Sequence, residues 1–239
     1  MEKPVFMGKT TEDLITELME HELNLDIELV NEIAARKDAD VCLLRKLQDY
    51  SEHGWTPIHA IHLLGMIKTR QSFFALCYAI VNRQEFLSGW LIESMPGLLA
   101  GFGPEYLPEL ERLFAMESMD KFARSVATGA ISAIGWKHPE ARARAVSFLK
   151  GVVERESNPY LVADAICELC SLGEASAVPI IEKAFKERRV DEIVIDMDEA
   201  VKEAKGELDC ETPEDTLRRC EGYFTDENFE FLRETNAGS

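Results

Sequence analysis

The feature that most constrains this chain is an internal repeat, in which a helix of small and aliphatic residues leads into glycine. Four such glycines lie 36, 34 and 38 residues apart: Gly65, Gly101, Gly135 and Gly173. A turn and a second helix follow each glycine, and two of these second helices carry matching prolines 71 residues apart, at Pro108 and Pro179. A helix–glycine–helix unit of this length cannot bury its apolar faces alone, so neighbouring units must stack. The repeat predicts an all-α fold, an α-α superhelix of about four helix pairs with helical caps.

Helical periodicity extends through nearly the whole chain. We expect helices at about 10–21, 24–36, 39–51, 57–67, 71–82, 86–100, 104–116, 119–134, 139–154, 159–171, 175–188, 192–205, 213–221 and 226–233. Proline marks the first helical position of several: Pro57, Pro104, Pro139, Pro159 and Pro213. Thr56, Asn158 and Thr212 are suitable N-caps, and the repeat glycines fit left-handed C′ caps. Runs of alternating Val, Ile and Thr are absent, so no sheet is expected.

These features resemble those of a known group of repeat proteins. The helices ending at Gly65 and Gly135 make the sequence similar to the HEAT-repeat, armadillo-like superfamily, in particular to the short HEAT-like repeats first described in phycobilisome lyases. The stretch 55–65 also resembles the opening repeat of a family of uncharacterised bacterial HEAT-like proteins, some of which carry a zinc-binding C-terminal tail. The resemblance covers about residues 55–189 and implies a solenoid whose second helices line the concave side. The cysteine-rich tail is missing, because Cys210 and Cys220 are the only late cysteines.

The flanks differ from the repeats. We expect an N-terminal helical cap over 1–54, HEAT-like repeats over 55–189 and an acidic helical C-terminal cap over 190–239, all within one continuous structural domain. The formal charge of the chain is -18, and residues 190–239 hold 16 acidic and 5 basic side chains. This segment is interpreted as a solubilising cap with a polar outer face. The alternative is an acidic arm that competes for a basic partner.

Charge and hydropathy also bear on partners and location. A net negative surface repels polyanions, so neither nucleic acid nor an anionic membrane surface is expected as a partner. No apolar run approaches the 18 or so residues that span a bilayer, and the N-terminus has no secretory signal. The six cysteines are too few and too scattered for a disulfide scaffold. A cytoplasmic location is therefore predicted.

Histidines form the first candidate site. His59 and His62 lie three residues apart on one expected helix, with His53 in the preceding turn. The simplest interpretation is that one of these histidines is a structural polar residue, hydrogen-bonded at the groove or between repeats. The alternatives are contact with a ligand and metal binding. Neither an HExxH motif nor paired Cys and His spacing is present. We predict no metal and no cofactor.

Carboxylates and tryptophans supply the other candidates. Asp164 and Glu168 lie four residues apart, and Glu93 belongs to the corresponding helix of an earlier repeat; they either form a solvated face or line a groove. Trp55 and Trp90, near repeat ends, either seal one repeat against the next or anchor a partner. The pair Cys167 and Cys170 falls late in its helix, where the dipole does not lower a thiol pKa, so both are read as buried small residues.

The candidate partner-binding residues are therefore Trp55, His59, His62, Trp90, Glu93, Asp164 and Glu168. All belong to first helices. If second helices line the groove, as in HEAT arrays generally, the candidates become Gln71, Glu105, Arg142 and Glu182.

Three hypotheses about function follow. The first is a non-enzymatic scaffold or adaptor that binds a protein or peptide along an extended helical surface, motivated by the repeat and by the absence of a catalytic signature. The second is an enzyme or small-ligand-binding protein on a HEAT-like scaffold. The third is self-association into homo-oligomers through an exposed apolar helix.

Overall fold

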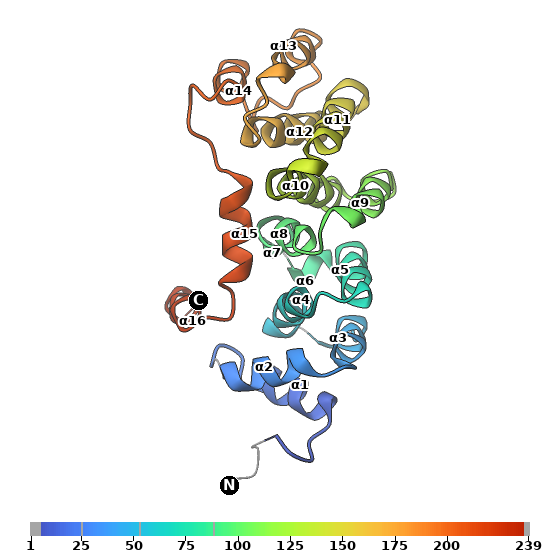
Figure 1. The fold of residues 1–239 in the computed structure, drawn as a ribbon, viewed down its shortest axis with the longest axis vertical. Helices are drawn as coiled ribbons and strands as arrows, with labels where there is room; N and C mark the ends of the chain where they lie inside the picture. The colour runs from blue at the N-terminus through green and yellow to red at the C-terminus, as the bar shows by residue number, and fades with distance from the viewer. Residues whose placement is uncertain (1–5, 25, 53, 88, 237–239) are drawn as a thin grey trace. The chain divides into compact units, whose positions relative to one another are not determined.

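A computed structural model describes residues 6–24, 26–52, 54–87 and 89–236. Within these ranges the chain is helical and contains no strand, which confirms the all-α class (Figure 1). None of the described helices is both long and apolar enough to cross a membrane. The chain divides into two compact units. Unit 1 comprises Met1–Trp90 with Arg219–Ser239, and unit 2 comprises Leu91–Arg218.

Unit 1 is built around helix α4 (Trp55–Ile67), which is buried on all sides from Thr56 to Gly65. A helix that is apolar all round suits a central position, and α4 packs against α2, α3 and α5. The C-terminal segment of the chain returns to this unit and ends in α16. The remaining helices of unit 1 are α1 (Thr11–Glu20), α2 (Ile27–Ala35), α3 (Ala39–Gln48), α5 (Arg70–Asn82), α6 (Gln84–Leu87) and α16 (Asp226–Asn236).

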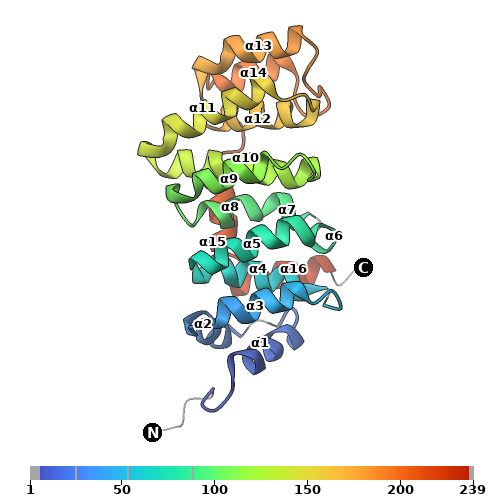
Figure 2. The ribbon, with the colours of Figure 1, turned by 90° about the vertical axis from the view of Figure 1, so that its right-hand side faces the viewer.

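Unit 2 is a two-layered helical stack. Its helices are α8 (Met95–Ala100), η1 (Pro104–Tyr106), α9 (Leu107–Phe114), α10 (Lys121–Lys137), α11 (Pro139–Arg155), α12 (Pro159–Ser171), η2 (Ala175–Ala177), α13 (Val178–Lys186) and α14 (Met197–Ala204). In the first layer, α10 packs on α8 and α12, and α12 packs on α14. The second layer holds α9, α11 and α13 and faces the viewer in Figure 2. Two short helices, α7 (Trp90–Glu93) and α15 (Pro213–Glu221), lie where the units meet along the chain.

Several predicted elements need correction. The helix expected over 86–100 is divided into α6, α7 and α8, and Pro96, in the first turn of α8, accounts for the break after α7. Helix α4 begins at Trp55 with Gly54 as its N-cap, so Thr56 and Pro57 lie inside the first turn. Asn158 does cap α12, where its side chain accepts a hydrogen bond from the backbone N–H of Tyr160 at 3.0 Å. Four of the five expected proline starts are confirmed: Pro104, Pro139, Pro159 and Pro213.

The repeat glycines have two different roles. Gly173 has a φ of +62° and occupies the left-handed region, as expected of a cap. Gly101 is right-handed at the end of α8, and Gly65 and Gly135 lie inside helices. At position 135, an added Cβ would lie 2.7 Å from Cβ of Ala145. This glycine therefore permits the close approach of α10 and α11. The prediction of a left-handed cap was wrong at Gly65, Gly101 and Gly135.

Candidate functional site

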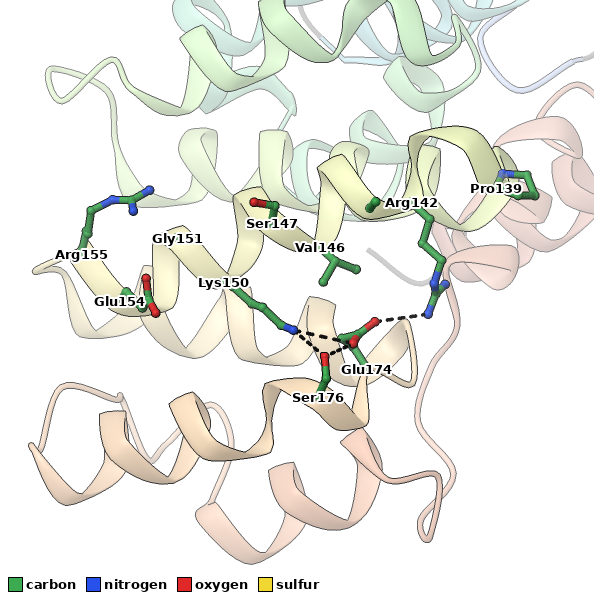
Figure 3. Close-up of a pocket in the computed structure, with 11 residues that line it drawn as sticks. Pro139, Arg142, Val146, Ser147, Lys150, Gly151, Glu154, Arg155, Glu174 and Ser176 are labelled. Atoms are coloured by element: carbon green, nitrogen blue, oxygen red, sulfur yellow. Dashed lines mark hydrogen bonds and ion pairs between the residues drawn. The ribbon is translucent and has the colours of Figure 1, made fainter.

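An open groove of about 730 Å³ runs along one face of α11 in unit 2. Its lining positions recur every three or four residues, so they share one side of the helix. The groove follows the helix over its full length, about 24 Å at the usual rise per residue. Glu174, in the turn before η2, and Ser176, within η2, form the opposite wall (Figure 3). The lining residues are Pro139, Arg142, Ala143, Val146, Ser147, Lys150, Gly151, Glu154, Arg155, Glu174 and Ser176.

Small side chains make this face of α11 hollow. Ala143, Ser147 and Gly151 stand at successive turns and leave room that longer side chains would fill. Gly151 has a further effect, since a Cβ at this position would collide with Nη2 of Arg155. The guanidinium of Arg155 therefore lies back across the helix, over the glycine.

The groove holds one carboxylate between two cations. Arg142 and Lys150 approach Glu174 from opposite sides (Figure 3), with N···O distances of 3.8 and 3.7 Å. Lys150 also donates to Oγ of Ser176 at 2.5 Å, and Ser176 donates to Glu174. Arg142 donates to the carbonyl of Leu172 at 2.5 Å. Three cations and two carboxylates line the groove, so it is locally positive in an acidic chain.

Sequence reasoning found one residue of this groove. Arg142 was a candidate on the condition that second helices line the binding face. Lys150, Arg155, Glu174 and Ser176 were missed. The available signal was the row of small residues along one helical face of 139–155, with basic residues beside it. The other second-helix candidates lie outside the groove: Gln71 and Glu105 are exposed, and Glu182 pairs with Lys186 on α13.

Four of the predicted residues gather in unit 1. His62 forms edge-to-face contacts with Trp90, and Trp55 contacts both His59 and Trp90. The C-terminal segment completes this cluster: the ring of Tyr223 stacks on His62 with centroids 3.5 Å apart and planes 3° from parallel. Three residues of the cluster were missed by sequence reasoning: Tyr223, Phe224 and Phe229. His53 lies outside the described residues.

Hydrogen bonds fix the tautomer of His59. Its Nε2 lies 2.7 Å from the carbonyl oxygen of Glu22, which only accepts, so Nε2 carries the proton. Nδ1 then accepts from the hydroxyl of Tyr223 at 2.8 Å. Burial lowers the pKa of His59 to about 4. Burial, together with the neighbouring His59, holds the pKa of His62 well below its ordinary value.

The carboxylate pair belongs to unit 2. Thr128 Oγ1 lies 2.7 Å from the carbonyl oxygen of Ser125 and 2.5 Å from Oδ2 of Asp164. A hydroxyl has one proton, so both contacts are satisfied only if Asp164 is protonated and donates to Thr128. Burial and the nearby Glu168 raise the pKa of Asp164 well above its ordinary value. Burial raises the pKa of Glu168 to about 7.

Glu93 does not form one described cluster with Asp164 and Glu168. Glu93 is exposed on α7, whereas Asp164 and Glu168 lie on α12 and face α10. Cys170 is buried as predicted, whereas Cys167 is only half-buried. The thiol of Cys170 donates to the carbonyl of Ala200 at 3.2 Å, and burial raises its pKa to about 12. Among the described residues, no three His, Cys, Asp or Glu side chains gather as metal ligands would.

Comparison with known proteins adds no family to this description. No protein-family model matches the chain, and no curated protein shows significant similarity to it. The HEAT-like resemblance rests on the repeat residues, and it stays a prediction.

Proposed function

We propose that this protein is a non-enzymatic interaction module whose α11 groove binds an acidic peptide segment of a partner protein. The observation that carries the proposal is the internal carboxylate of Glu174, which lies between Arg142 and Lys150 and accepts from Ser176. The groove thus already binds one carboxylate group of the chain itself. Arg155, at the far end of the groove, has no ion pair among the described residues and provides a further cation.

Dimensions support a peptide as the ligand. A groove of about 24 Å accommodates about seven residues of extended chain. Two small floor residues, Ala143 and Ser147, leave the backbone of a bound peptide room to approach α11. A short acidic peptide also carries far less charge than a nucleic acid, which a chain with a net charge of -18 repels over longer distances.

The HEAT-like architecture is part of the same proposal. Alternation of helices between two layers in unit 2 supports it, with α9, α11 and α13 as the second helices of successive pairs. In such arrays the second helices present the binding face, and α11 is one of them. We place this function in the cytoplasm. Self-association is a separate hypothesis.

Fluorescence anisotropy tests the proposal with a labelled glutamate-rich peptide of about eight residues. A peptide with glutamine in place of each glutamate is the uncharged probe. We expect the acidic peptide to bind and the glutamine peptide not to bind, with affinity falling as NaCl rises from about 50 to about 300 mM.

Two double variants locate the site. Lys150→Glu with Arg155→Glu should weaken binding by at least about tenfold, because two of the three cations of the groove are reversed. Lys183→Glu with Lys186→Glu makes the same charge change on exposed α13 lysines and should leave binding unchanged. Equal loss in both double variants, or equal binding of both peptides, would contradict the proposal.

A further inference from the structure

The C-terminal segment is anchored on unit 1 by a few apolar side chains. Tyr223, Phe224, Phe229 and Leu232 are each less than a tenth exposed. Around them the segment is polar, and Phe231 on the same helix is 58% exposed. Between described residues, polar anchors include the hydrogen bond from Tyr223 to His59 and a 2.8 Å bond from Nη1 of Arg233 to the carbonyl of Leu23. Residues 223–236, here called the strap, are thus held mainly by contacts around two histidines.

His62 has an uncommon environment for an imidazole. It is 2% exposed, and neither Nδ1 nor Nε2 has a hydrogen-bond partner in the described part of the chain. The ring of Tyr223 covers one of its faces. A neutral imidazole tolerates this environment at the cost of its unmade hydrogen bonds, whereas a buried cation without an acceptor is far more unfavourable.

We infer that the strap covers α4 while His59 and His62 are neutral, and that it detaches from α4, or opens, when they are protonated at acidic pH. Protonation of His59 turns Nδ1 from the acceptor of the Tyr223 hydroxyl into a donor, so the hydrogen bond must reverse, and the hydroxyl proton of Tyr223 then has no other acceptor among the described residues. Protonation of His62 places a charge against the ring of Tyr223 with no partner for either N–H. Opening the strap exposes both imidazoles to water, which stabilises the charged forms.

No described carboxylate contacts either imidazole, and the aromatic faces around them attract a cation only weakly. The turn after α1 contributes the Glu22 carbonyl, which already accepts from His59. Helix α7 contributes the Trp90 indole, and α4 itself contributes Trp55. The strap contributes the phenol of Tyr223 and two phenyl rings; its carboxylates at 226, 227, 230 and 234 are exposed.

The other buried charged side chains of unit 1 form hydrogen bonds outside the histidine cluster. Asp40, on α3, accepts from the hydroxyl of Thr69 at 2.5 Å. Arg83, which follows α5, donates to the carbonyls of Asp49 and Glu52 at 3.2 and 2.6 Å. Helices α2, α3 and α5 therefore bring no described carboxylate into hydrogen-bond contact with either imidazole.

The sign of the pH effect follows from proton uptake. Burial lowers the pKa of each histidine, and opening removes the part of that burial that the strap provides, so the open state binds more protons below pH 6.5 and closure weakens as pH falls. With a pKa of 6.5 when open and about 4 when closed, His59 alone shifts the equilibrium toward opening about 30-fold between about pH 7.5 and pH 5. His62 adds to this shift in the same direction.

Hydrogen–deuterium exchange of the full chain tests the inference, with rates corrected for the intrinsic effect of pH. Amides of the strap should lose at least about 30-fold protection between about pH 7.5 and pH 5, while α10–α13 retain theirs. The double variant His59→Gln with His62→Phe should abolish the loss, since glutamine keeps a donor and an acceptor and phenylalanine keeps a ring. His138→Gln, outside the cluster, should respond as the original chain does.

Two further variants keep the test decisive if the double variant closes poorly. Phe229→Ala should open the strap at about pH 7.5, and Phe231→Ala, on the exposed side of α16, should leave it closed. This pair shows that strap amides report the opening. A strap that stays protected at pH 5, or that opens equally in the histidine double variant, would overturn the inference. The result is independent of peptide binding at the α11 groove.

Discussion

At the scale of single residues, unit 2 buries a carboxyl pair whose raised pKa values lower stability at neutral pH. The one proton of Thr128 requires a neutral Asp164, and burial raises the pKa of Glu168 to about 7. Sequence spacing predicted that Asp164 and Glu168 share a helix face. It did not predict their partners, because Thr128 lies 36 residues away from Asp164, on α10.

Replacing Glu168 with glutamine should therefore stabilise the protein in a pH-dependent way. The pKa of Glu168 is raised by folding, so its stabilising effect is complete below about pH 4.5 and is lost as pH rises toward 7. E168Q should raise the free energy of unfolding by about 1–3 kcal/mol at pH 8 and change it little at pH 4.5. Urea denaturation at the two pH values measures this difference. The exposed E117Q is the control, and an E168Q effect of equal size at both pH values would contradict the account.

At the scale of helices, the sequence predicted what local rules determine. The expected bounds 159–171 and 213–221 agree with α12 and α15, because a capping residue and a proline mark each start. The glycine pattern was harder to interpret. A glycine near a helix end serves either as a left-handed cap or as a site of close helix contact, and sequence spacing does not separate the two roles.

Two alanine substitutions in unit 2 separate these roles. Gly135→Ala places a Cβ 2.7 Å from Cβ of Ala145, so α10 and α11 must move apart. We expect a net cost of about 1–2 kcal/mol, because overpacking exceeds the gain in helix propensity. At Gly151 the colliding atom is the flexible end of Arg155, so Gly151→Ala should be neutral or stabilising by up to about 1 kcal/mol. Thermal denaturation compares the two variants, and equal effects would contradict the assignment of Gly135 to helix contact.

At the scale of the whole molecule, the chain forms two compact units, and the sequence of unit 2 is inserted within that of unit 1. The acidic C-terminal region was predicted as one cap over 190–239, and the repeats were predicted over 55–189. That division stays a prediction. The boundaries between the two compact units fall at 90/91 and 218/219. Sequence patterns did not indicate the return of the strap to α4, because its contact joins residues 164 positions apart and depends on a few aromatic side chains. Sequence patterns did not indicate the groove either, since its opposite wall comes from the turn at Glu174 and the short helix η2.

The most direct test of the central claim is a backbone NMR titration of the full chain with the glutamate-rich peptide. Binding in the α11 groove predicts amide shift changes confined to 139–155 and 172–176, which saturate with the affinity found by anisotropy. The Lys150→Glu, Arg155→Glu variant should lose these changes while its other resonances stay in place. Shift changes centred on α13 or on the strap, or none at saturating peptide, would contradict the assignment of the groove as the binding site.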